Sequence, residues 1–221
     1  MSLWLKIVPF KRWKPPKRTR GSKRRVNSEN HLAQEDCRLI AGLPLQVVRY
    51  RSCGRDPAGC CVSDLLRDEP VVRSGREANY QAGKDTGRFW DAGASNVHWV
   101  IVKDDQVERG INEALGRIEA DGVIVEGNSF LEYLTADLAI MCARAKGGII
   151  KSSARKALAK SDVLYLSTLD GNASTARRDF EQFCTTLTAS FAINGLPILT
   201  WEDFPSLLMQ INTLTECNFL A

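Results

Sequence analysis

The sequence predicts an α/β protein in which a mostly parallel sheet is flanked by helices. From about residue 45 onward, apolar stretches of strand length alternate with stretches in which apolar residues recur at helical spacing. The connections between them are short, and several strand-like stretches are apolar at consecutive positions. Strands inside a parallel sheet are buried on both faces, and this continuous apolar pattern is typical of them.

The expected elements can be placed in chain order. A short helix is expected over 31–42, where Gly42 follows the last periodic residue. Strands are expected over 45–50, 96–102, 121–127, 136–143, 163–167 and 196–200. Helices are expected from about Asp85 to Gly93 and over 104–120, 152–162, 174–192 and 201–214. Without an internal repeat, this order predicts a single α/β domain over 28–221.

The composition places the chain in a broad class. Its 221 residues are enough for one α/β domain with a sizeable core. No apolar run is long enough to cross a membrane, and no apolar stretch follows the basic N-terminus as in a secretory signal. We therefore expect a cytoplasmic protein without a membrane partner. Its seven cysteines, an odd number, are expected to be reduced thiols.

The N-terminal segment differs in charge from the rest of the chain. Residues 1–25 contain ten Lys or Arg and no acidic residue, whereas acidic residues outnumber basic ones in the remainder. Dense positive charge with few apolar residues predicts a disordered tail over 1–27. An arm that binds nucleic acid, with Trp4 and Trp13 as stacking groups, is the less favoured interpretation.

The segment 82–94, "AGKDTGRFWDAGA", concentrates charge at the expected start of a helix. A helix beginning near Asp85 or Thr86 directs backbone N–H groups and the positive end of its dipole toward an anion. Lys84 and Arg88 would add positive charge there, and Asp85 or Thr86 could reach a metal ion. The alternative is an ordinary capped helix with solvated charges.

A second candidate is the segment 123–127, "VIVEG", where a strand ends in a carboxylate. Ligands of open parallel sheets bind at the carboxyl ends of the strands. Glu126 is therefore the candidate catalytic residue, ordering a magnesium-bound or attacking water, and Gly127 would let a phosphate approach the backbone. A solvated strand end is the alternative. Lys151 could line the same pocket, or simply precede a capped helix.

These segments resemble the molybdopterin-guanine dinucleotide biosynthesis protein B family of P-loop nucleotide-binding proteins. The shared residues are Gly83-Lys84-Asp85-Thr86, Ala92-Gly93-Ala94 and Glu126-Gly127, in the same order, and the resemblance covers about residues 45–170. It implies a three-layer P-loop NTPase-like architecture, GTP bound with Mg²⁺, a homodimer, and partners among the molybdenum-cofactor biosynthesis proteins. On this basis we assign nucleotide contact to Lys84, Asp85, Thr86, Arg88, Gly127 and Lys151.

One part of the family's pattern is missing. The phosphate-binding loop G-x-x-x-x-G-K-[ST] should precede the strand at 45–50, and nothing in residues 1–45 matches it. That loop supplies the backbone cradle and the lysine for phosphates, and the hydroxyl for magnesium. A frameshift or misassigned start is one explanation, and a relative that has abandoned hydrolysis is the other. We therefore expect a GTP-binding accessory protein with weak or no catalysis.

A cysteine-rich loop suggests a second function. Cys53, Cys60 and Cys61 lie near a glycine-containing turn, with Cys37 upstream, and thiolates there could bind zinc or an iron–sulfur cluster. The spacing matches no standard ligand pattern, so reduced loop cysteines are the alternative. The second candidate function is a non-catalytic binding protein of the same fold that holds a metal or partner through this loop. His98, inside an expected strand, is expected to be packed.

Overall fold

The computed structural model describes residues 4–7, 45–53, 63–120, 122–144, 152–167, 172–185 and 195–217 of the chain. The helix expected over 31–42 lies outside these ranges, as do Lys151, Cys60 and Cys61. No helix in the described ranges is both long enough and apolar enough to cross a membrane.

The first sheet has the strand order β3-β4-β2-β5. At its centre β2 (Leu45–Cys53) pairs in parallel with β4 (Asn96–Lys103) and with β5 (Gly122–Glu126). The edge strand β3 (Val71–Ser74) runs antiparallel to β4. This is the α/β arrangement predicted from the sequence, with an antiparallel strand added at one edge.

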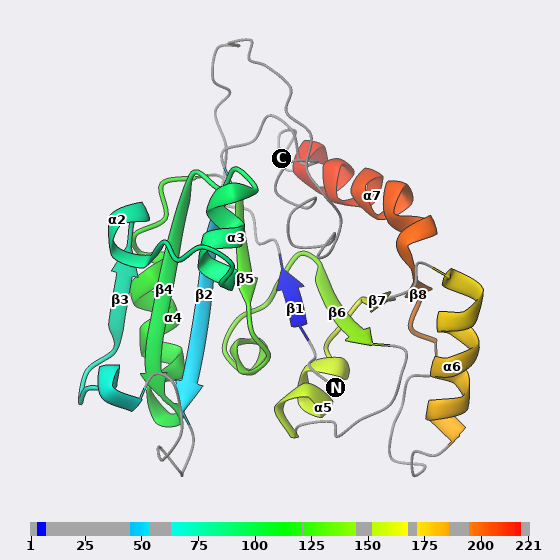
Figure 1. Ribbon diagram of the computed structural model, residues 1–221, viewed down its shortest axis with the longest axis horizontal. Helices are drawn as coiled ribbons and strands as arrows, with labels where there is room; N and C mark the ends of the chain where they lie inside the picture. Colours follow the sequence, from blue (N-terminus) through cyan, green and yellow to red (C-terminus); the bar gives the residue numbers. More distant parts are fainter. Residues whose placement is uncertain are drawn as a thin grey trace.

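The second sheet has the order β1-β6-β7-β8. Here β6 (Ala139–Arg144), β7 (Val163–Ser167) and β8 (Ile198–Leu199) are parallel. The first strand, β1 (Trp4–Ile7), pairs antiparallel to β6. It contacts β5 as well and lies between β5 and β6 in Figure 1, so that the two sheets adjoin through β1.

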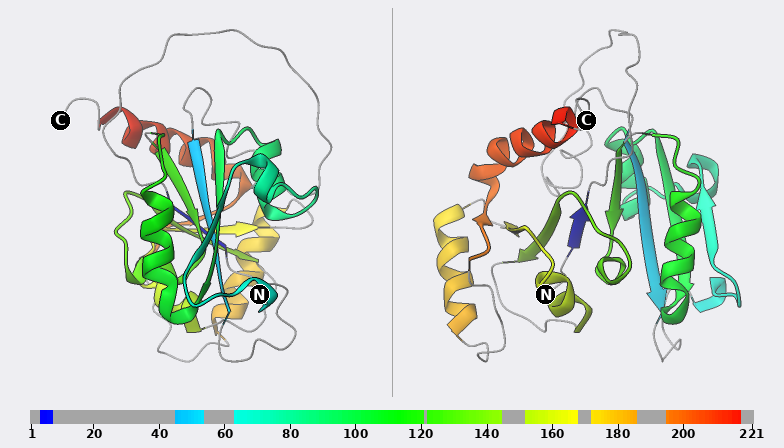
Figure 2. Two further views of the ribbon diagram at one scale, coloured as in Figure 1. Left: turned by 90° about the vertical axis from the view of Figure 1, so that its left-hand side faces the viewer. Right: turned by 180° about the vertical axis from the view of Figure 1, so that it is seen from behind.

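The helices cover the two sheets from both sides. One hydrophobic cluster joins both sheets to α4 (Val107–Leu115), α5 (Ser152–Leu158) and α6 (Ala173–Thr185). A second cluster, on the opposite face, joins both sheets to α3 (Asp85–Asp91) and α7 (Phe204–Cys217). The views in Figure 2 show α4 and α3 on opposite sides of the β2 sheet.

Side chains along the strands alternate between the two clusters. On β6, Ala139 and Met141 belong to the α4 side, whereas Ile140 and Cys142 belong to the α3 side. Because helices cover both faces of the sheet, side chains that point to either face are buried and apolar. This alternation explains the continuous apolar runs that predicted buried parallel strands.

The strands expected at 45–50, 96–102 and 121–127 are confirmed as β2, β4 and β5. The three later strands and the helices at α3, α4, α5, α6 and α7 are confirmed too, although the structure shortens several of them. Three of the strands and α-helices in the described ranges had not been expected. These are β1 within the segment interpreted as a disordered tail, the four-residue edge strand β3, and the one-turn helix α2 (Arg76–Asn79).

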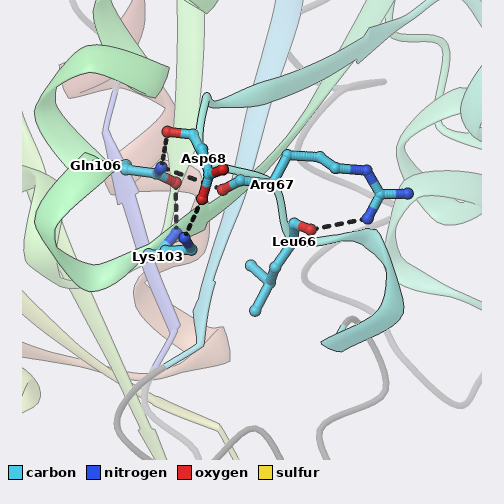
Figure 3. Close-up of polar contacts among 5 residues, drawn as sticks. All are labelled: Leu66, Arg67, Asp68, Lys103 and Gln106. Carbon is cyan, nitrogen blue, oxygen red and sulfur yellow. Dashed lines mark hydrogen bonds and ion pairs between the residues drawn. The ribbon is translucent and has the colours of Figure 1, made fainter.

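A buried glutamine fixes the connection between β4 and α4. The Gln106 amide nitrogen donates to the carbonyl oxygens of Asp68 at 2.6 Å and of Arg67 at 3.2 Å, while its oxygen accepts from the Lys103 backbone N–H at 2.9 Å (Figure 3). Lys103 Nζ lies 3.0 Å from a carboxylate oxygen of Asp68. Gln106 thereby satisfies backbone groups of the segment before β3, and we interpret this contact as structural.

Candidate functional site

The first turn of α3 packs closely against the backbone of the turn that precedes it. A Cβ atom on Gly87 would lie 2.1 Å from the carbonyl oxygen of Gln81, so only glycine allows the turn before the helix to lie this close. Gly83, inside that turn, has a φ of 73°, in the left-handed region that favours glycine. The glycines of the segment 82–94 therefore place the start of α3, and Asp85 with it.

The other end of α3 is closed by a Schellman motif. The Ala94 N–H donates to Phe89 O at 3.1 Å and the Gly93 N–H donates to Trp90 O at 3.0 Å. Gly93 has a φ of 94°, and Phe89 and Ala94 are both buried in the cluster below the helix. Phe89 thus packs in the core and anchors α3 on the sheet.

An arginine with no motif to mark it in the sequence lies below the start of α3. Arg49 on β2 stands directly beside Glu126, the last residue of β5. Both continue the rows of Val47 and Ile124, which face the α3 side of the sheet. The Arg49 guanidinium forms an ion pair with the Glu126 carboxylate, and these side chains are only 13% and 6% exposed.

Arg49 also connects the sheet to α3. Its Nη2 atom lies 2.5 Å from Oδ2 of Asp85, the first residue of the helix. The second Asp85 oxygen, Oδ1, accepts a hydrogen bond of 3.4 Å from Arg88 Nη1. We call Arg49, Asp85, Arg88 and Glu126 the arginine–carboxylate cluster. Within it the charges alternate, so that each carboxylate faces at least one guanidinium.

An aromatic side chain lies in the same cross-strand row. Trp99 on β4 is in register with Arg49 on one side and with Arg73 of β3 on the other. The Arg73 guanidinium carbon lies 5.9 Å from the centre of the Trp99 ring, within cation–π range. Trp99 remains partly exposed. The α3 side of the sheet therefore presents an indole ring next to the cluster.

The chain leaves β5 through a turn with an unpaired acceptor. Gly127 has a φ of 151°, a positive value that residues with side chains rarely adopt. The side-chain oxygen of Asn128 is buried and accepts no hydrogen bond, and it is the one such side-chain atom within the described ranges. A buried acceptor without a donor is costly, so a ligand N–H or hydroxyl would be stabilised there.

The other predicted site residues differ in exposure, and some of them lie outside the described part of the chain. Lys84 is exposed and precedes α3 in an extended conformation, without a side-chain cap. Thr86 is buried. Cys53 ends β2, but its side chain lies outside the described part of the chain, together with Lys151, Cys60 and Cys61. The cysteine-loop prediction is therefore not addressed by the described residues.

Binding of Mg²⁺ at the cluster would depend on its carboxylate oxygens. Mg²⁺ takes oxygen ligands at about 2.0–2.1 Å in octahedral geometry. Here Arg49 pairs with one oxygen each of Glu126 and Asp85, and Arg88 takes the other Asp85 oxygen. Within the described ranges no group of three or more His, Cys, Asp or Glu could hold a metal. In this arrangement Arg49 and Arg88 are paired with three of the four carboxylate oxygens of Asp85 and Glu126.

His98 is packed, as the sequence predicted. Its Nδ1 lies 2.8 Å from Ser74 Oγ and its Nε2 lies 2.9 Å from Gln46 Oε1, and the ring is 1% exposed. Burial, with a smaller contribution from the Arg117 charge, lowers the pKa of His98 from 6.5 to about 4. Both ring nitrogens are occupied by protein partners, so His98 is a structural residue on the α4 side of the sheet.

Comparison with known proteins adds no relative. No protein-family model, no curated protein and no solved structure matches the chain.

Proposed function

We propose that the chain binds a purine nucleoside triphosphate at the arginine–carboxylate cluster and the start of α3. The observation that carries this proposal is that Asp85 and Arg88 meet Glu126 around Arg49. Asp85, Arg88 and Glu126 come from the two segments that resemble the molybdopterin-guanine dinucleotide biosynthesis protein B family. GTP as the nucleotide, a P-loop-like fold, a role in molybdenum-cofactor biosynthesis and a homodimer enter the proposal from that resemblance alone.

Positive charge on the α3 side would recognise the phosphates. Arg49 and Arg88 present guanidinium groups, which match phosphate oxygens in a planar, two-pronged geometry. Lys84 is exposed immediately before α3 and can add a mobile ammonium group. Gly127 would allow a phosphate near the backbone after β5, where the Asn128 oxygen needs a donor. These features favour an anionic ligand that also carries N–H or hydroxyl groups.

Trp99 offers a surface for the base. It stands in the cross-strand row next to Arg49 and is partly exposed. Stacking of a base on an aromatic ring contributes about 1–3 kcal/mol and tolerates any base. The ring therefore supports binding of a nucleotide but does not select guanine over adenine.

We expect turnover to be slow. Glu126 is the carboxylate that would have to orient an attacking water, yet it is bound by Arg49 and almost fully buried. No phosphate-binding loop is present in the sequence to hold a triphosphate in line for attack. The role that fits is an accessory protein that binds nucleotide, with Glu126 as the catalytic candidate for residual hydrolysis.

The proposal is tested by titrating the purified chain with fluorescent GTP and ATP analogues. We expect saturable binding that Lys84→Gln weakens about 10- to 150-fold, because a charged contact to phosphate contributes about 1.5–3 kcal/mol. Lys84 is exposed, so this substitution leaves the core unchanged. Lys156→Gln is the matched control: Lys156 is an exposed lysine on α5, on the opposite side of the sheet, and pairs with Glu132 at 3.0 Å.

Two results would contradict the proposal. One is the absence of binding for either nucleotide at millimolar concentration. The other is an equal loss of affinity in Lys84→Gln and Lys156→Gln, which would indicate attraction by overall charge rather than a site. Sedimentation of the same sample, with and without nucleotide, tests the homodimer.

A further inference from the structure

The cluster places one guanidinium between two carboxylates from different elements. Arg49 contacts Glu126 at the end of β5 through Nη1, and Asp85 at the start of α3 through Nη2. Arg88 neutralises the remaining oxygen of Asp85 at 3.4 Å. A cation bridging the strand-end carboxylate and the helix-start carboxylate would compete with these guanidinium groups for the carboxylate oxygens.

A divalent ion and Arg49 compete for this position. Like charges a few ångströms apart in a poorly hydrated site repel strongly. The guanidinium is always protonated, so it cannot make room for a divalent ion by losing its charge. It is also well matched to its place, because its planar fork donates to two separate carboxylates at once.

From this geometry we infer that Arg49 is a built-in replacement for the divalent cation of the nucleotide site. The inference rests on the proposed function for its ligand and makes that ligand a nucleotide bound without magnesium. The phosphates then meet guanidinium N–H groups instead of a metal. The two carboxylates serve to position Arg49 and Arg88 for this contact, rather than to ligate a metal.

Manganese, as a spectroscopic probe for a magnesium site, tests the position of Arg49 without any nucleotide. Free Mn²⁺ is measured by electron paramagnetic resonance in the presence of the unaltered chain and of Arg49→Met. We expect the unaltered chain to leave Mn²⁺ free at submillimolar concentration. Arg49→Met exposes two carboxylates to each other and should bind Mn²⁺ at least about tenfold more tightly. Adding Glu126→Gln to Arg49→Met should abolish that gain.

Arg49→Met takes a guanidinium away from the buried Glu126 carboxylate, so the fold of this variant needs a check of its own. Its thermal midpoint should rise when Mn²⁺ is added, whereas that of the unaltered chain should not. Arg49→Lys retains a positive charge and should gain no Mn²⁺ affinity, which separates the charge from the general effect of substitution. Tight Mn²⁺ binding by the unaltered chain that Glu126→Gln removes would overturn the inference, whether or not Arg49→Met folds.

The affinity for nucleotide is measured on the unaltered chain in a buffer containing EDTA and in a buffer containing Mg²⁺. Equal affinity in the two buffers is expected, and a loss of binding in EDTA would overturn the inference. Absence of binding in both buffers would instead overturn the proposed function. The manganese titration, which uses no nucleotide, would then still decide whether Arg49 holds the cation position.

Discussion

At the scale of single residues, His98 shows how a polar side chain is accommodated inside this sheet. Its two ring nitrogens meet Ser74 and Gln46, and Arg117, which donates to Ser74 Oγ at 3.3 Å, adds a positive charge nearby. The ring is therefore satisfied in its neutral form and disfavoured as a cation. Its position in a strand was predicted, but these partners come from β2, β3 and the turn after α4.

The lowered pKa of His98 predicts a pH-dependent stability. Between pH 6.5 and about 4 the unfolded chain binds a proton that the folded chain does not. The free energy of unfolding should therefore fall as the pH drops through this window, by up to about 3 kcal/mol. Urea denaturation at a series of pH values measures this slope, and His98→Gln should flatten it.

The other histidine of the chain provides the control. His31→Gln removes the second imidazole of the chain, and the slope should remain. A slope that survives in His98→Gln but disappears in His31→Gln would contradict the assignment to His98.

At the scale of elements, α3 depends on glycines for its position. The sequence predicted the helix and its end at Gly93, and the Schellman motif gives the reason for that end. What the spacing did not indicate is the contact between Gly87 and the preceding turn. That contact involves backbone atoms, which leave no side-chain pattern beyond the glycine itself.

Gly87→Ala should displace α3 from the sheet. The added methyl group would meet the Gln81 carbonyl oxygen at 2.1 Å, a backbone atom that cannot rotate away. We expect a loss of about 1–3 kcal/mol in the free energy of unfolding, together with weaker nucleotide binding because Asp85 and Arg88 move. Thermal denaturation and the GTP titration measure the two effects.

Gly116→Ala is the matched control for this prediction. Its nearest atom to a new Cβ is the Glu113 carbonyl oxygen at 3.4 Å, and its φ is negative. Its stability should change little. Equal destabilisation by the two substitutions would show that the close approach at Gly87 has no special cost.

At the scale of the whole molecule, the two sheets share their hydrophobic clusters. Val125 of the β2 sheet and Leu164 of the β6 sheet lie in the α4-side cluster, and Ile124 and Tyr165 lie in the α3-side cluster. Neither sheet can lose its packing without exposing apolar surface of the other. The two sheets should therefore unfold together.

Cooperative unfolding is tested with Leu166→Ala on β7. Leu166 is fully buried in the α4-side cluster, so its truncation should cost about 2–5 kcal/mol. Urea transitions followed by far-ultraviolet circular dichroism and by tryptophan fluorescence should coincide and shift together. Separate transitions, or a shift seen by only one probe, would indicate that the sheets unfold independently. Ser206→Ala, on the exposed side of α7, is the control.

Much of the architecture could be predicted because it depends on the local spacing of apolar residues. The apolar run of β5 and the spacing of Val107, Ile111 and Leu115 on α4 reflect burial, which period and hydrophobicity report directly. The short edge strand β3 was missed because four residues after Pro70 carry almost no periodicity. β1 was missed because a few apolar residues were outweighed by surrounding basic charge.

The sequence by itself determined the α/β class, the positions of most strands and helices, and three members of the arginine–carboxylate cluster. Those features follow from the alternation of apolar segments and from carboxylates and arginines at the ends of elements. Only the tertiary structure decided that Arg49 joins the cluster, because strand register brings it beside Glu126 and helix packing brings Asp85 above it. A charge in mid-strand has no local signature, and its partners are set by register and packing.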